Sequence, residues 1–417
     1  MKDVLVRRID ADREMLVDFL QRFVRCKTPN PPGDTLEAAH FVEAEFGKRG
    51  IQYDRIAPAA DRPNYIASFD TGRPGKHMVL NGHIDVFPVE SEAGWTRDPW
   101  GGQLVDGKVY GRGSCDMRCG TTASIFAYFY LHEVRDKLNG RLTLTVVSDE
   151  ETFSPPGMLH LMEHHRDRVL GDVCLNGEPS SPYSVRFGEK GPLWVRMRTK
   201  ARGGHGAFVH VSPSAVQAAI AAIAELQDLP NRIPVNEPPE LARALDEATP
   251  DLERAYGKGA ARVIRSLTVN IGRIVGGVKV NMIPAACEFD VDIRVPNGAD
   301  YDAVQAEVRA IAGRHGCEME ILTASRPNWR EPYHELMDIV RENAAMLKPG
   351  LMPARVVSPG GTDARLWRLN GVPAVVYGPS PHGMGSVDEY VSIDEFMHVV
   401  KSHALAAWDY LSRPRAG

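Results

Sequence analysis

The sequence lacks a long hydrophobic run and contains few cysteines. No stretch of its 417 residues approaches the run of roughly 18 apolar residues that a membrane-spanning helix requires. The charged N-terminal segment has no apolar core like that of a signal peptide. The six cysteines are scattered along the chain and form no CxxC pair. Such cysteines are typical of reduced thiols in a large protein, so we expect a cytoplasmic protein without a membrane partner.

A strong excess of charge of either sign is also lacking. The formal net charge is -5, charged residues make up 25% of the chain and hydrophobic residues 43%. This composition is typical of globular proteins, and a mildly acidic protein gives no reason to expect a nucleic-acid partner. Because 417 residues exceed what one ordinary hydrophobic core can organise, we expect two domains.

Short apolar runs alternate with helical stretches in much of the chain. Apolar runs of this length, bounded by turn residues, are typical of buried strands. Their alternation with helices predicts an α/β domain with a mostly parallel central sheet flanked by helices. The predicted strands are residues 65–69, 77–80, 142–147, 172–175 and 374–377, and the predicted helices are residues 1–24, 35–49, 120–138 and 334–348, with a last helix from residue 393.

The pattern changes near residue 186. Strands at 192–199, 267–275, 287–294 and 318–323 and helices at 212–226 and 300–315 follow one another in the order β-α-β-β-α-β. This order is that of a ferredoxin-like unit. We therefore predict that residues 186–324 form an inserted ferredoxin-like α+β domain, while residues 1–185 and 325–417 form the first domain. The proline-rich segment Pro230–Pro239 and the polar helix after it are expected to be a surface insertion.

A histidine and an aspartate stand two residues apart at the end of one apolar run. The segment Val79–Val86 carries His83 and Asp85 directly after the predicted strand. At the ends of strands in an α/β sheet, side chains face the crevice where ligands bind. A metal-binding histidine usually leans on a nearby carboxylate. Taken alone, the pair is more typical of a surface histidine beside a turn aspartate.

Carboxylates occupy similar positions further along the chain. Asp116 lies in a glycine-dense segment where a long helix begins, although aspartate also simply favours helix N-termini. Glu150 and Glu151 end an acidic triplet after one apolar run, and Glu178 follows the next. Adjacent carboxylates ionise together only when a cation or a shared proton compensates them; a solvated acidic turn is the alternative. One histidine and several carboxylates suit Zn²⁺, Mn²⁺ or Co²⁺, and a bridging aspartate could serve two ions.

Short motifs containing these residues run in order through the first domain. They are Gly82-His83-Ile84-Asp85, Gly111-Arg112-Gly113 with Asp116-Met117, Asp149-Glu150-Glu151, and Gly177-Glu178-Pro179. In sequence and order these motifs resemble the M20 family of metallo-amidohydrolases and peptidases, and the resemblance covers nearly the whole chain. That family includes acetylornithine deacetylase, succinyl-diaminopimelate desuccinylase, aminoacylase and the glutamate carboxypeptidases.

The resemblance implies a metal-binding role for several of these side chains. His83 and Glu178 would hold one divalent ion, Glu151 would hold a second, and Asp116 would bridge the two. We expect one or two ions per subunit, with zinc preferred over cobalt or manganese.

The resemblance also implies catalytic roles for Glu150 and Asp85. Glu150 would be the general base that takes a proton from the attacking water and returns it to the leaving amine, and Asp85 would orient His83. We expect hydrolysis of the amide bond of an N-acyl amino acid or a similar small amide that bears a carboxylate. The alternatives are a dipeptidase or carboxypeptidase, or a hydrolytic deaminase of an aromatic amino acid. A non-catalytic binding protein is disfavoured, because it needs no general base.

The inserted domain resembles the lid of the same family. His205 matches a histidine that stabilises the oxyanion, often from the partner subunit, and Asn281 matches a residue that lines the substrate site. Arg294 matches a position that binds a substrate carboxylate, and Gly360 lies in a glycine-rich loop that resembles the family's substrate loop. From spacing alone, an ordinary loop histidine, a turn asparagine and a surface arginine are alternatives. The resemblance further implies a homodimer formed through the inserted domain.

The match is incomplete at two places. The family has a last metal-binding histidine shortly before an acidic residue and a glutamate. If Asp388-Glu389 sets the register, that position falls on Gly385, and His382 lies three residues too early. Either the loop bulges so that His382 reaches the metal, or this ligand is absent; we expect His382 to be the ligand, because no other histidine is near. The segment Glu151–Gly157 replaces the small, glycine-rich segment that is more usual there, and its Phe153 either reshapes the pocket or has a packing role.

Overall fold

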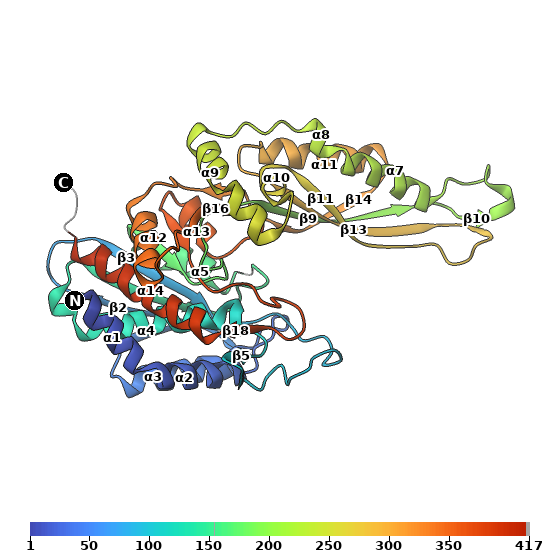
Figure 1. Cartoon of the computed structure of the whole chain (residues 1–417). Helices are drawn as coiled ribbons and strands as arrows, with labels where there is room; N and C mark the ends of the chain where they lie inside the picture. The colour runs from blue at the N-terminus through green and yellow to red at the C-terminus, as the bar shows by residue number, and fades with distance from the viewer. Residues whose placement is uncertain (154, 414–417) are drawn as a thin grey trace. The chain divides into compact units, whose positions relative to one another are not determined.

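The computed structural model of the protein describes residues 1–153 and 155–413. The chain forms two compact units. The first unit comprises Met1–Phe187, Arg330–Val356 and the chain from Thr362 onward, and the second comprises Gly188–Trp329 and Val357–Gly361. In Figure 1 the blue and red ends of the chain belong to the first unit, and most of the segment coloured yellow-green to orange belongs to the second.

The first unit is built on a sheet with the strand order β1-β2-β6-β3-β7-β17-β8. The central strands are parallel to one another and almost wholly buried, as apolar strands covered on both faces should be. They are β6 (Arg141–Val147), β3 (His77–His83), β7 (Val173–Asn176) and β17 (Ala374–Val376). Antiparallel strands flank them: β1 (Tyr53–Ala59) and β2 (Arg62–Asp70) on one side, and β8 (Ser184–Glu189) on the other. The predicted, mostly parallel central sheet is confirmed.

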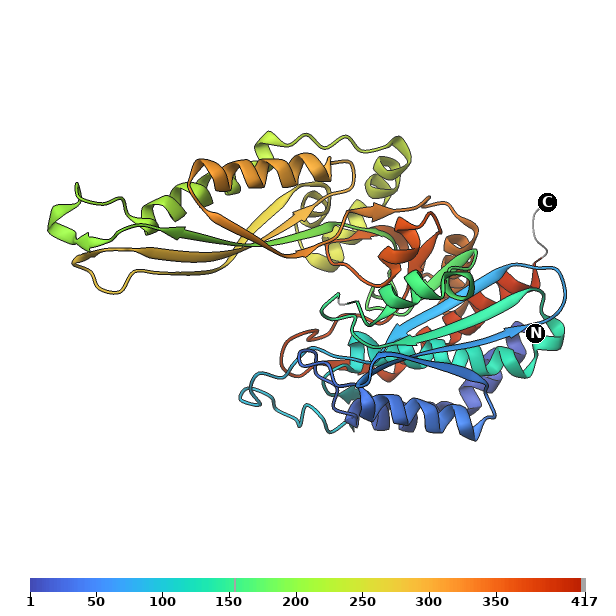
Figure 2. The same ribbon diagram turned by 180° about the vertical axis from the view of Figure 1, so that it is seen from behind.

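Helices cover both faces of this sheet (Figures 1 and 2). One face is covered by α4 (Cys119–Glu133) and α14 (Ile393–Ser412), and the other by α5 (Met158–His164), α6 (Arg166–Val169) and α13 (Ala364–Leu369). On the second face, Trp367 belongs to a buried cluster with Val79 and Val147. Every residue of α4 from Cys119 to Leu131 is buried. The helix that follows the Asp116 segment is therefore fixed on all sides.

The N-terminal helical segment differs from its prediction. Residues 1–24 form two helices, α1 (Lys2–Ala11) and α2 (Arg13–Arg25), rather than one. The break lies at Asp12, whose carboxylate accepts hydrogen bonds from Arg8 Nε at 2.8 Å and from the Tyr130 hydroxyl at 3.0 Å. Aspartate readily exchanges helical geometry for such bonds. The helices α3 (Leu36–Lys48) and α12 (Glu335–Leu347) lie within their predicted ranges.

A small antiparallel sheet joins two segments that are far apart in sequence. It consists of β4 (Gln103–Val105), β5 (Lys108–Tyr110) and β18 (Tyr390–Ser392). Tyr390 of β18 lies opposite Tyr110 of β5. The chain then passes from β5 into the short helical turn η1 (Ser114–Arg118), which contains Asp116. The residues just before β18 are therefore neighbours of the Asp116 segment.

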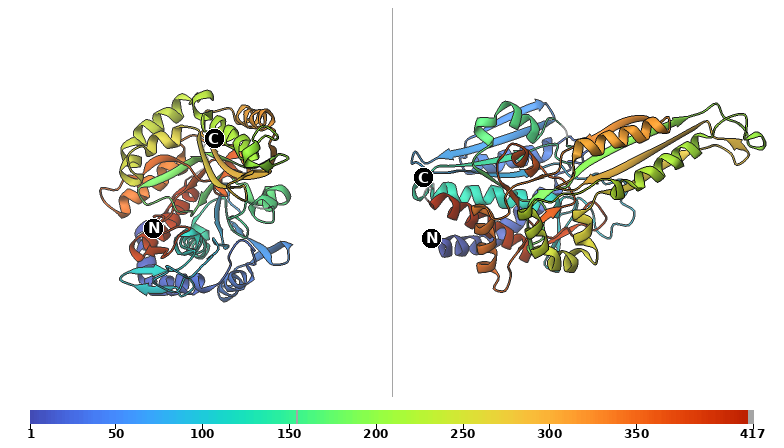
Figure 3. Two further views of the ribbon diagram at one scale, coloured as in Figure 1. Left: turned by 90° about the vertical axis from the view of Figure 1, so that its right-hand side faces the viewer. Right: turned by 90° about the horizontal axis from the view of Figure 1, so that it is seen from above.

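The second unit contains the antiparallel sheet β11-β13-β9-β14. Its strands are β9 (Gly191–Lys200), β11 (Thr268–Gly276), β13 (Ala286–Val295) and β14 (Glu318–Ala324), and the helices α7 (Ala215–Gln227) and α11 (Tyr301–Arg314) pack on one face (Figure 3). Inward residues such as Phe289 are buried, whereas outward charges pair with each other, as Arg196 Nε and Asp290 Oδ1 do at 2.7 Å. The chain order β-α-β-β-α-β confirms the predicted ferredoxin-like topology.

Smaller elements complete the second unit. The helices α8 (Leu229–Arg232), α9 (Pro239–Tyr256) and α10 (Ala260–Arg265) lie between α7 and β11 in the chain, where the sequence predicts an insertion. The short strands are β10 (Gly204–His205), which pairs with β12 (Met282–Ile283), and β15 (Asn328–Trp329), which pairs with the end of β8. The strand β16 (Ala354–Ser358), which begins in the first unit, also pairs with β8. No helix within the described ranges is both long and apolar enough to span a membrane.

Candidate metal centre

The ends of the parallel strands bring the predicted histidine and carboxylates to one edge of the sheet. His83 is the last residue of β3, and Glu178 follows β7 by two residues. Asp116 enters from the turn before α4. Ligand atoms of these three buried residues all lie within 4.8 Å of one another. Because carboxyl ends of parallel strands meet at one edge, the sequence positions and the geometry agree.

His83 Nε2 lies among three carboxylates. It is 3.2 Å from Glu178 Oε1, 3.6 Å from Asp116 Oδ1 and 3.9 Å from Glu150 Oε2. Burial and the Asp116 carboxylate raise the pKa of Glu178 to about 8. Burial and the Glu178 carboxylate likewise raise the pKa of Glu150 well above its usual value. Negative charges concentrated in a buried place are unfavourable unless a cation compensates them.

Several polar atoms at this edge are buried without a hydrogen-bond partner. They are His83 Nε2, Glu150 Oε1 and Glu151 Oε1, which all belong to residues that the structure describes. Buried polar groups normally find partners, so each such atom needs an explanation. An imidazole nitrogen and carboxylate oxygens are the donors that Zn²⁺, Mn²⁺ and Co²⁺ take in proteins. The residues present therefore fit a divalent metal ion.

Asp85 holds both the histidine and the acidic segment in place. Its side chain is fully buried, and Oδ1 lies 3.4 Å from His83 Nδ1. The same carboxylate accepts hydrogen bonds from the backbone amide of Glu150 at 3.2 Å and from that of Glu151 at 3.1 Å. Asn30 Nδ2 donates to Oδ2 at 2.8 Å. The backbone carbonyl of Asp85 also lies 3.0 Å from His83 Nδ1, so Asp85 contacts both His83 and the backbone of Glu150 and Glu151.

Sequence reasoning did not single out Asn30 or Arg62. Asn30 Nδ2 lies 2.8 Å from Asp85 Oδ2 and 2.7 Å from Asp149 Oδ1, so one amide group joins two buried carboxylates. Arg62 Nη1 lies 3.3 Å from Asp149 Oδ2. The proline-rich turn around Asn30 was visible in the sequence, but nothing local connected it to the acidic segment, and Arg62 carried no pattern at all.

Arg365 is a further residue that the sequence did not reveal. Its Nη1 lies 3.8 Å from Glu150 Oε1 and 3.7 Å from Asp363 Oδ1. Its guanidinium lies 4.1 Å from the centre of the Phe153 ring, a distance at which a cation is attracted by the aromatic face. Phe153, one of the two departures from the family pattern, therefore packs on the cation that approaches Glu150.

The side chain of His382 lies against the residues that follow it in the chain. Its ring stacks on Tyr390, with the ring centroids 4.5 Å apart and the planes at 6°. Its Nε2 is 3.9 Å from Glu395 Oε1, and the side chain is 37% exposed. Among the residues that the structure describes, the group of clustered ligand atoms does not include His382. Its role as a ligand stays a prediction.

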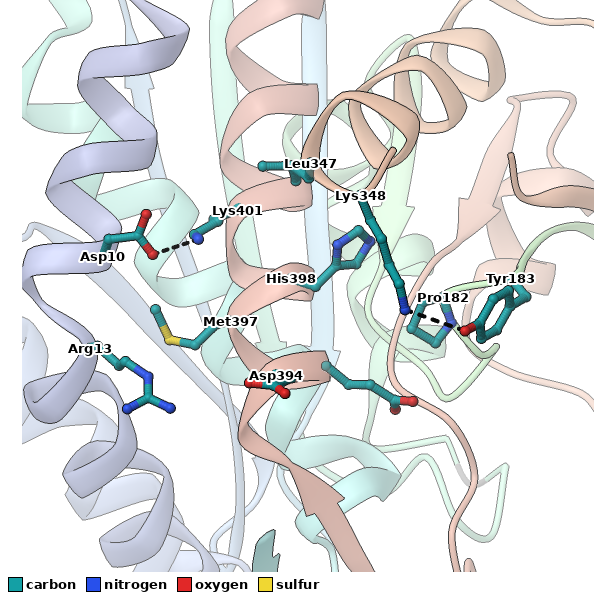
Figure 4. Close-up of a pocket in the computed structure, with 11 residues that line it drawn as sticks. Asp10, Arg13, Pro182, Tyr183, Leu347, Lys348, Asp394, Met397, His398 and Lys401 are labelled. Carbon is teal, nitrogen blue, oxygen red and sulfur yellow. Dashed lines mark hydrogen bonds and ion pairs between the residues drawn. The ribbon is translucent and has the colours of Figure 1, made fainter. Parts of the chain in front are cut away.

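Glu395 also lines a cavity of about 370 Å³ in the first unit (Figure 4). Charged and polar groups around the cavity contact each other, since Lys401 Nζ lies 2.5 Å from Asp10 Oδ1 and Lys348 Nζ lies 3.3 Å from the Tyr183 hydroxyl. None of the predicted site residues is among the side chains that line it. The cavity is therefore distinct from the metal centre.

The segments that carry two of the predicted substrate residues, His205 and Asn281, are adjacent within the second unit. The pairing of β10 with β12 places His205 opposite Met282, and the backbone amide of Gly206 donates to the Asn281 carbonyl at 2.8 Å. His205 Nδ1 accepts a hydrogen bond from the Ala207 amide at 3.2 Å. The two predicted lid motifs, about 75 residues apart in sequence, are thus adjacent in the fold.

The other two predicted substrate residues make local contacts in the same unit. Arg294 Nε donates to Asp292 Oδ1 at 2.7 Å, and its guanidinium lies 5.3 Å from the centre of the Trp194 ring. The amide of Gly360 donates to Ser358 Oγ at 3.1 Å. Substrate binding by either residue stays a prediction.

Comparison with known proteins assigns the family. A family profile described as peptidase family M20/M25/M40 matches residues 79–409, and the chain therefore belongs to this family. Similar proteins include the succinyl-diaminopimelate desuccinylases of Cereibacter sphaeroides strain KD131 and Stenotrophomonas maltophilia strain R551-3. Both are 28% identical to this chain; the first match covers 89% of this chain and 92% of that protein, and the second covers 88% and 91%.

Solved structures of low sequence identity share the fold. The M20 family metallo-carboxypeptidase Sso-CP2 from Sulfolobus solfataricus has a TM-score of 0.82 at 17% identity, covering 95% of this chain and 99% of that one. The dipeptidase Dug1p from Saccharomyces cerevisiae has a TM-score of 0.79 at 15% identity, covering 100% and 99%. The Bacillus subtilis YXEP protein, described as a dinuclear metal binding peptidase, has a TM-score of 0.64 at 15% identity, covering 96% and 99%.

Proposed function

We propose that the protein is a metal-dependent hydrolase that cleaves the amide bond of an N-acyl amino acid or a similar small amide with a carboxylate. The observation that carries this proposal is the buried convergence of His83, Asp116 and Glu178, with Glu150 beside them. The similarity to desuccinylases, whose name describes removal of an acyl group from an amino acid, supports the substrate class. Structural likeness to a carboxypeptidase and a dipeptidase makes peptide cleavage the second candidate.

The proposed metal ligands divide into two sets. His83 and Glu178 would hold one ion, Glu151 would hold a second, and Asp116 would bridge them. His382, whose ring stacks on Tyr390, is proposed as the last ligand of the second ion. We propose zinc, with cobalt or manganese as alternatives, because one nitrogen and several oxygen donors suit all three ions.

The chain's own groups then carry the proton transfers. A bound divalent ion supplies Lewis-acid chemistry that lowers the pKa of a water molecule toward neutrality. Glu150 takes one proton from that water as the water oxygen bonds to the amide carbonyl carbon. The bond between carbon and nitrogen breaks, and Glu150 returns the proton to the leaving nitrogen, giving a carboxylic acid and an amine. Asp85 keeps Glu150 in place through its backbone amide.

Residues of the second unit are proposed to bind the substrate. His205 would stabilise the oxyanion, Arg294 would pair with the substrate carboxylate, and Asn281 and Gly360 would line the site. The adjacency of the Asn281 and His205 segments supports a common role for these two. For Arg294 to bind a carboxylate, its guanidinium would exchange or share its present partner Asp292.

We also propose that the second unit forms a homodimer. Apolar side chains near the β10–β12 pair are exposed, among them Val280 at 100%, Val278 at 92%, Val209 at 74% and Phe208 at 56%. Apolar side chains grouped on a surface favour an interface with another chain. The strand β11 is also an edge of its sheet and presents unpaired backbone groups. The proposed location is the cytoplasm, which is consistent with six free cysteines.

Replacement of Glu150 tests the reaction. Zinc-loaded protein would be assayed with N-succinyl and N-acetyl amino acids and with dipeptides. Glu150→Gln should lower kcat by about 10²–10⁴-fold while the affinity for zinc is largely kept, because the general base is lost and the proposed ligands remain. The matched control is Glu45→Gln, a buried carboxylate on α3 that contacts arginines and a lysine away from the centre. Wild-type kcat in Glu150→Gln would contradict the mechanism, and turnover of dipeptides alone would favour the second candidate.

A further inference from the structure

Glu389 contacts the backbone of the turn that carries Asp116. Its side chain is fully buried, and Oε1 accepts hydrogen bonds from the backbone amides of Cys115 at 3.1 Å and Asp116 at 3.2 Å. Both donors lie in the turn between β5 and α4. The carboxylate of Glu389 therefore fixes the position of the Asp116 backbone rather than that of its side chain.

The second oxygen of Glu389 is held by Arg112. Arg112 Nη1 lies 2.6 Å from Glu389 Oε2, and Arg112 Nη2 donates to the Ser386 carbonyl at 3.1 Å. The backbone adds a further bond, since the Gly111 amide donates to the Glu389 carbonyl at 2.9 Å. We call Arg112 and Glu389 together the Arg112–Glu389 clamp. It joins the segment before Asp116 to the segment before β18, more than 270 residues away in sequence.

A buried ion pair is not required merely to hold two segments together. Burying an ion pair carries a desolvation penalty, and apolar side chains of similar volume often stabilise a fold equally well. The pairing of Tyr110 with Tyr390 already joins β5 to β18. The distinctive contribution of the clamp is the pair of bonds to the Cys115 and Asp116 amides, for which a carboxylate is a stronger acceptor than a neutral group.

We propose that Glu389, held by Arg112, is a positioning residue that sets the place of Asp116 relative to His83 and Glu178. This inference rests on the proposed metal centre, in which Asp116 is a ligand. Metal–ligand distances are confined to about 0.2 Å around their normal values, so a small displacement of the Asp116 backbone weakens binding. Residues that orient ligands without touching the ion typically contribute about 10–100-fold to metal affinity.

Zinc titration of metal-free protein by calorimetry tests the clamp. Glu389→Gln keeps the size of the side chain but removes its charge. If the amide oxygen keeps the two backbone donors, the amide N–H group faces Arg112, which then loses its acceptor. We expect zinc affinity to fall by about 10–100-fold. The matched control is Glu45→Gln, because Glu45 is also a buried carboxylate, with Lys48 Nζ at 2.7 Å and Arg49 Nη1 at 2.8 Å. The control should lose thermal stability but keep wild-type zinc affinity.

A second variant keeps the test decisive if Glu389→Gln does not fold. Glu389→Asp retains the charge for Arg112 but is one methylene shorter, so it cannot reach both amides, and its zinc affinity should also fall. In the cobalt-loaded protein, the visible absorption of the bound ion should change in the Glu389 variants and stay unchanged in Glu45→Gln. Folded Glu389 variants with wild-type affinity and spectrum would overturn the inference while leaving the metal centre intact. A wild-type protein that binds no zinc or cobalt would instead overturn the proposed function.

Discussion

Gly120 lies where the backbone of α4 touches the backbone that precedes Glu178. A Cβ placed on Gly120 would overlap the carbonyl oxygen of Gly177 and lie 2.7 Å from its Cα, and a Cβ on Gly177 would lie 2.6 Å from the Gly120 Cα. Ordinary contacts of a Cβ lie at 3.4–4 Å, and a backbone neighbour cannot rotate away. This close approach sets the distance between the segments that carry Asp116 and Glu178.

Substituting alanine for Gly120 should push these two segments apart. The Cβ would lie 1.8 Å from the Gly177 carbonyl oxygen, so raising this separation to at least 3.4 Å needs a shift of about 1.6 Å, which exceeds the tolerance of about 0.2 Å for metal–ligand distances. Zinc affinity should fall clearly, and kcat/KM should fall by about 100-fold or more, because a displacement of about 1 Å at a reacting centre already costs about that much. Overpacking should also lower the free energy of unfolding by about 1–3 kcal/mol.

Urea unfolding of metal-free protein and zinc calorimetry would measure the two effects. The control is Gly47→Ala on α3, where a Cβ meets nothing within 4 Å. Because alanine favours a helix over glycine, this control should raise the free energy of unfolding by up to about 1 kcal/mol and leave zinc affinity unchanged. A Gly120→Ala protein with wild-type stability and zinc affinity would show that the Gly120–Gly177 contact does not set the spacing of these segments.

Two further predictions concern the core and the surface. Burial lowers the pKa of His403 from 6.5 to about 4. As the pH falls, this imidazole is therefore protonated in the unfolded chain before it is protonated in the folded protein. About 3 kcal/mol of the free energy of unfolding should be lost between pH 6.5 and pH 4. Between pH 6.5 and pH 4, the urea midpoint of unfolding should fall less in His403→Gln than in the wild type. Equal falls in the two proteins would contradict the assignment of this pH dependence to His403. Light scattering should give the wild type twice the chain mass of 46.0 kDa, with a smaller dimer fraction for Val280→Asp; a wild-type monomer would contradict the proposed dimer.

The strand-end residues were the predictable part of the fold and the site. Apolar runs mark β3, β6 and β7, and the polar residues that follow such runs belong to one edge of a parallel sheet. For that reason His83 and Glu178 could be brought together from local patterns alone. The ferredoxin-like order of the second unit was equally visible, because its period-2 strands and its helices alternate in a recognisable sequence.

Long-range contacts account for what the sequence could not predict. Asn30, Arg365 and Glu389 reach the centre across 100 residues or more from Asp149, Glu150 and Asp116, and none stands in a local pattern that names its partner. The stacking of His382 on Tyr390 is of the same kind, since it depends on how one loop turns. The periodicity of hydrophobic residues and the positions of turn residues are local features, and they carry no information on contacts between distant segments.

The metal content of the purified protein shows whether the proposed metal centre exists. After incubation with zinc and removal of the free ion, elemental analysis would compare the wild type with His83→Ala. We expect one or two ions per wild-type chain, and at least one ion fewer in His83→Ala, because His83 Nε2 lies 3.2 Å from Glu178 Oε1 and 3.6 Å from Asp116 Oδ1. A wild-type protein without zinc, or a His83→Ala protein with the wild-type content, would contradict it.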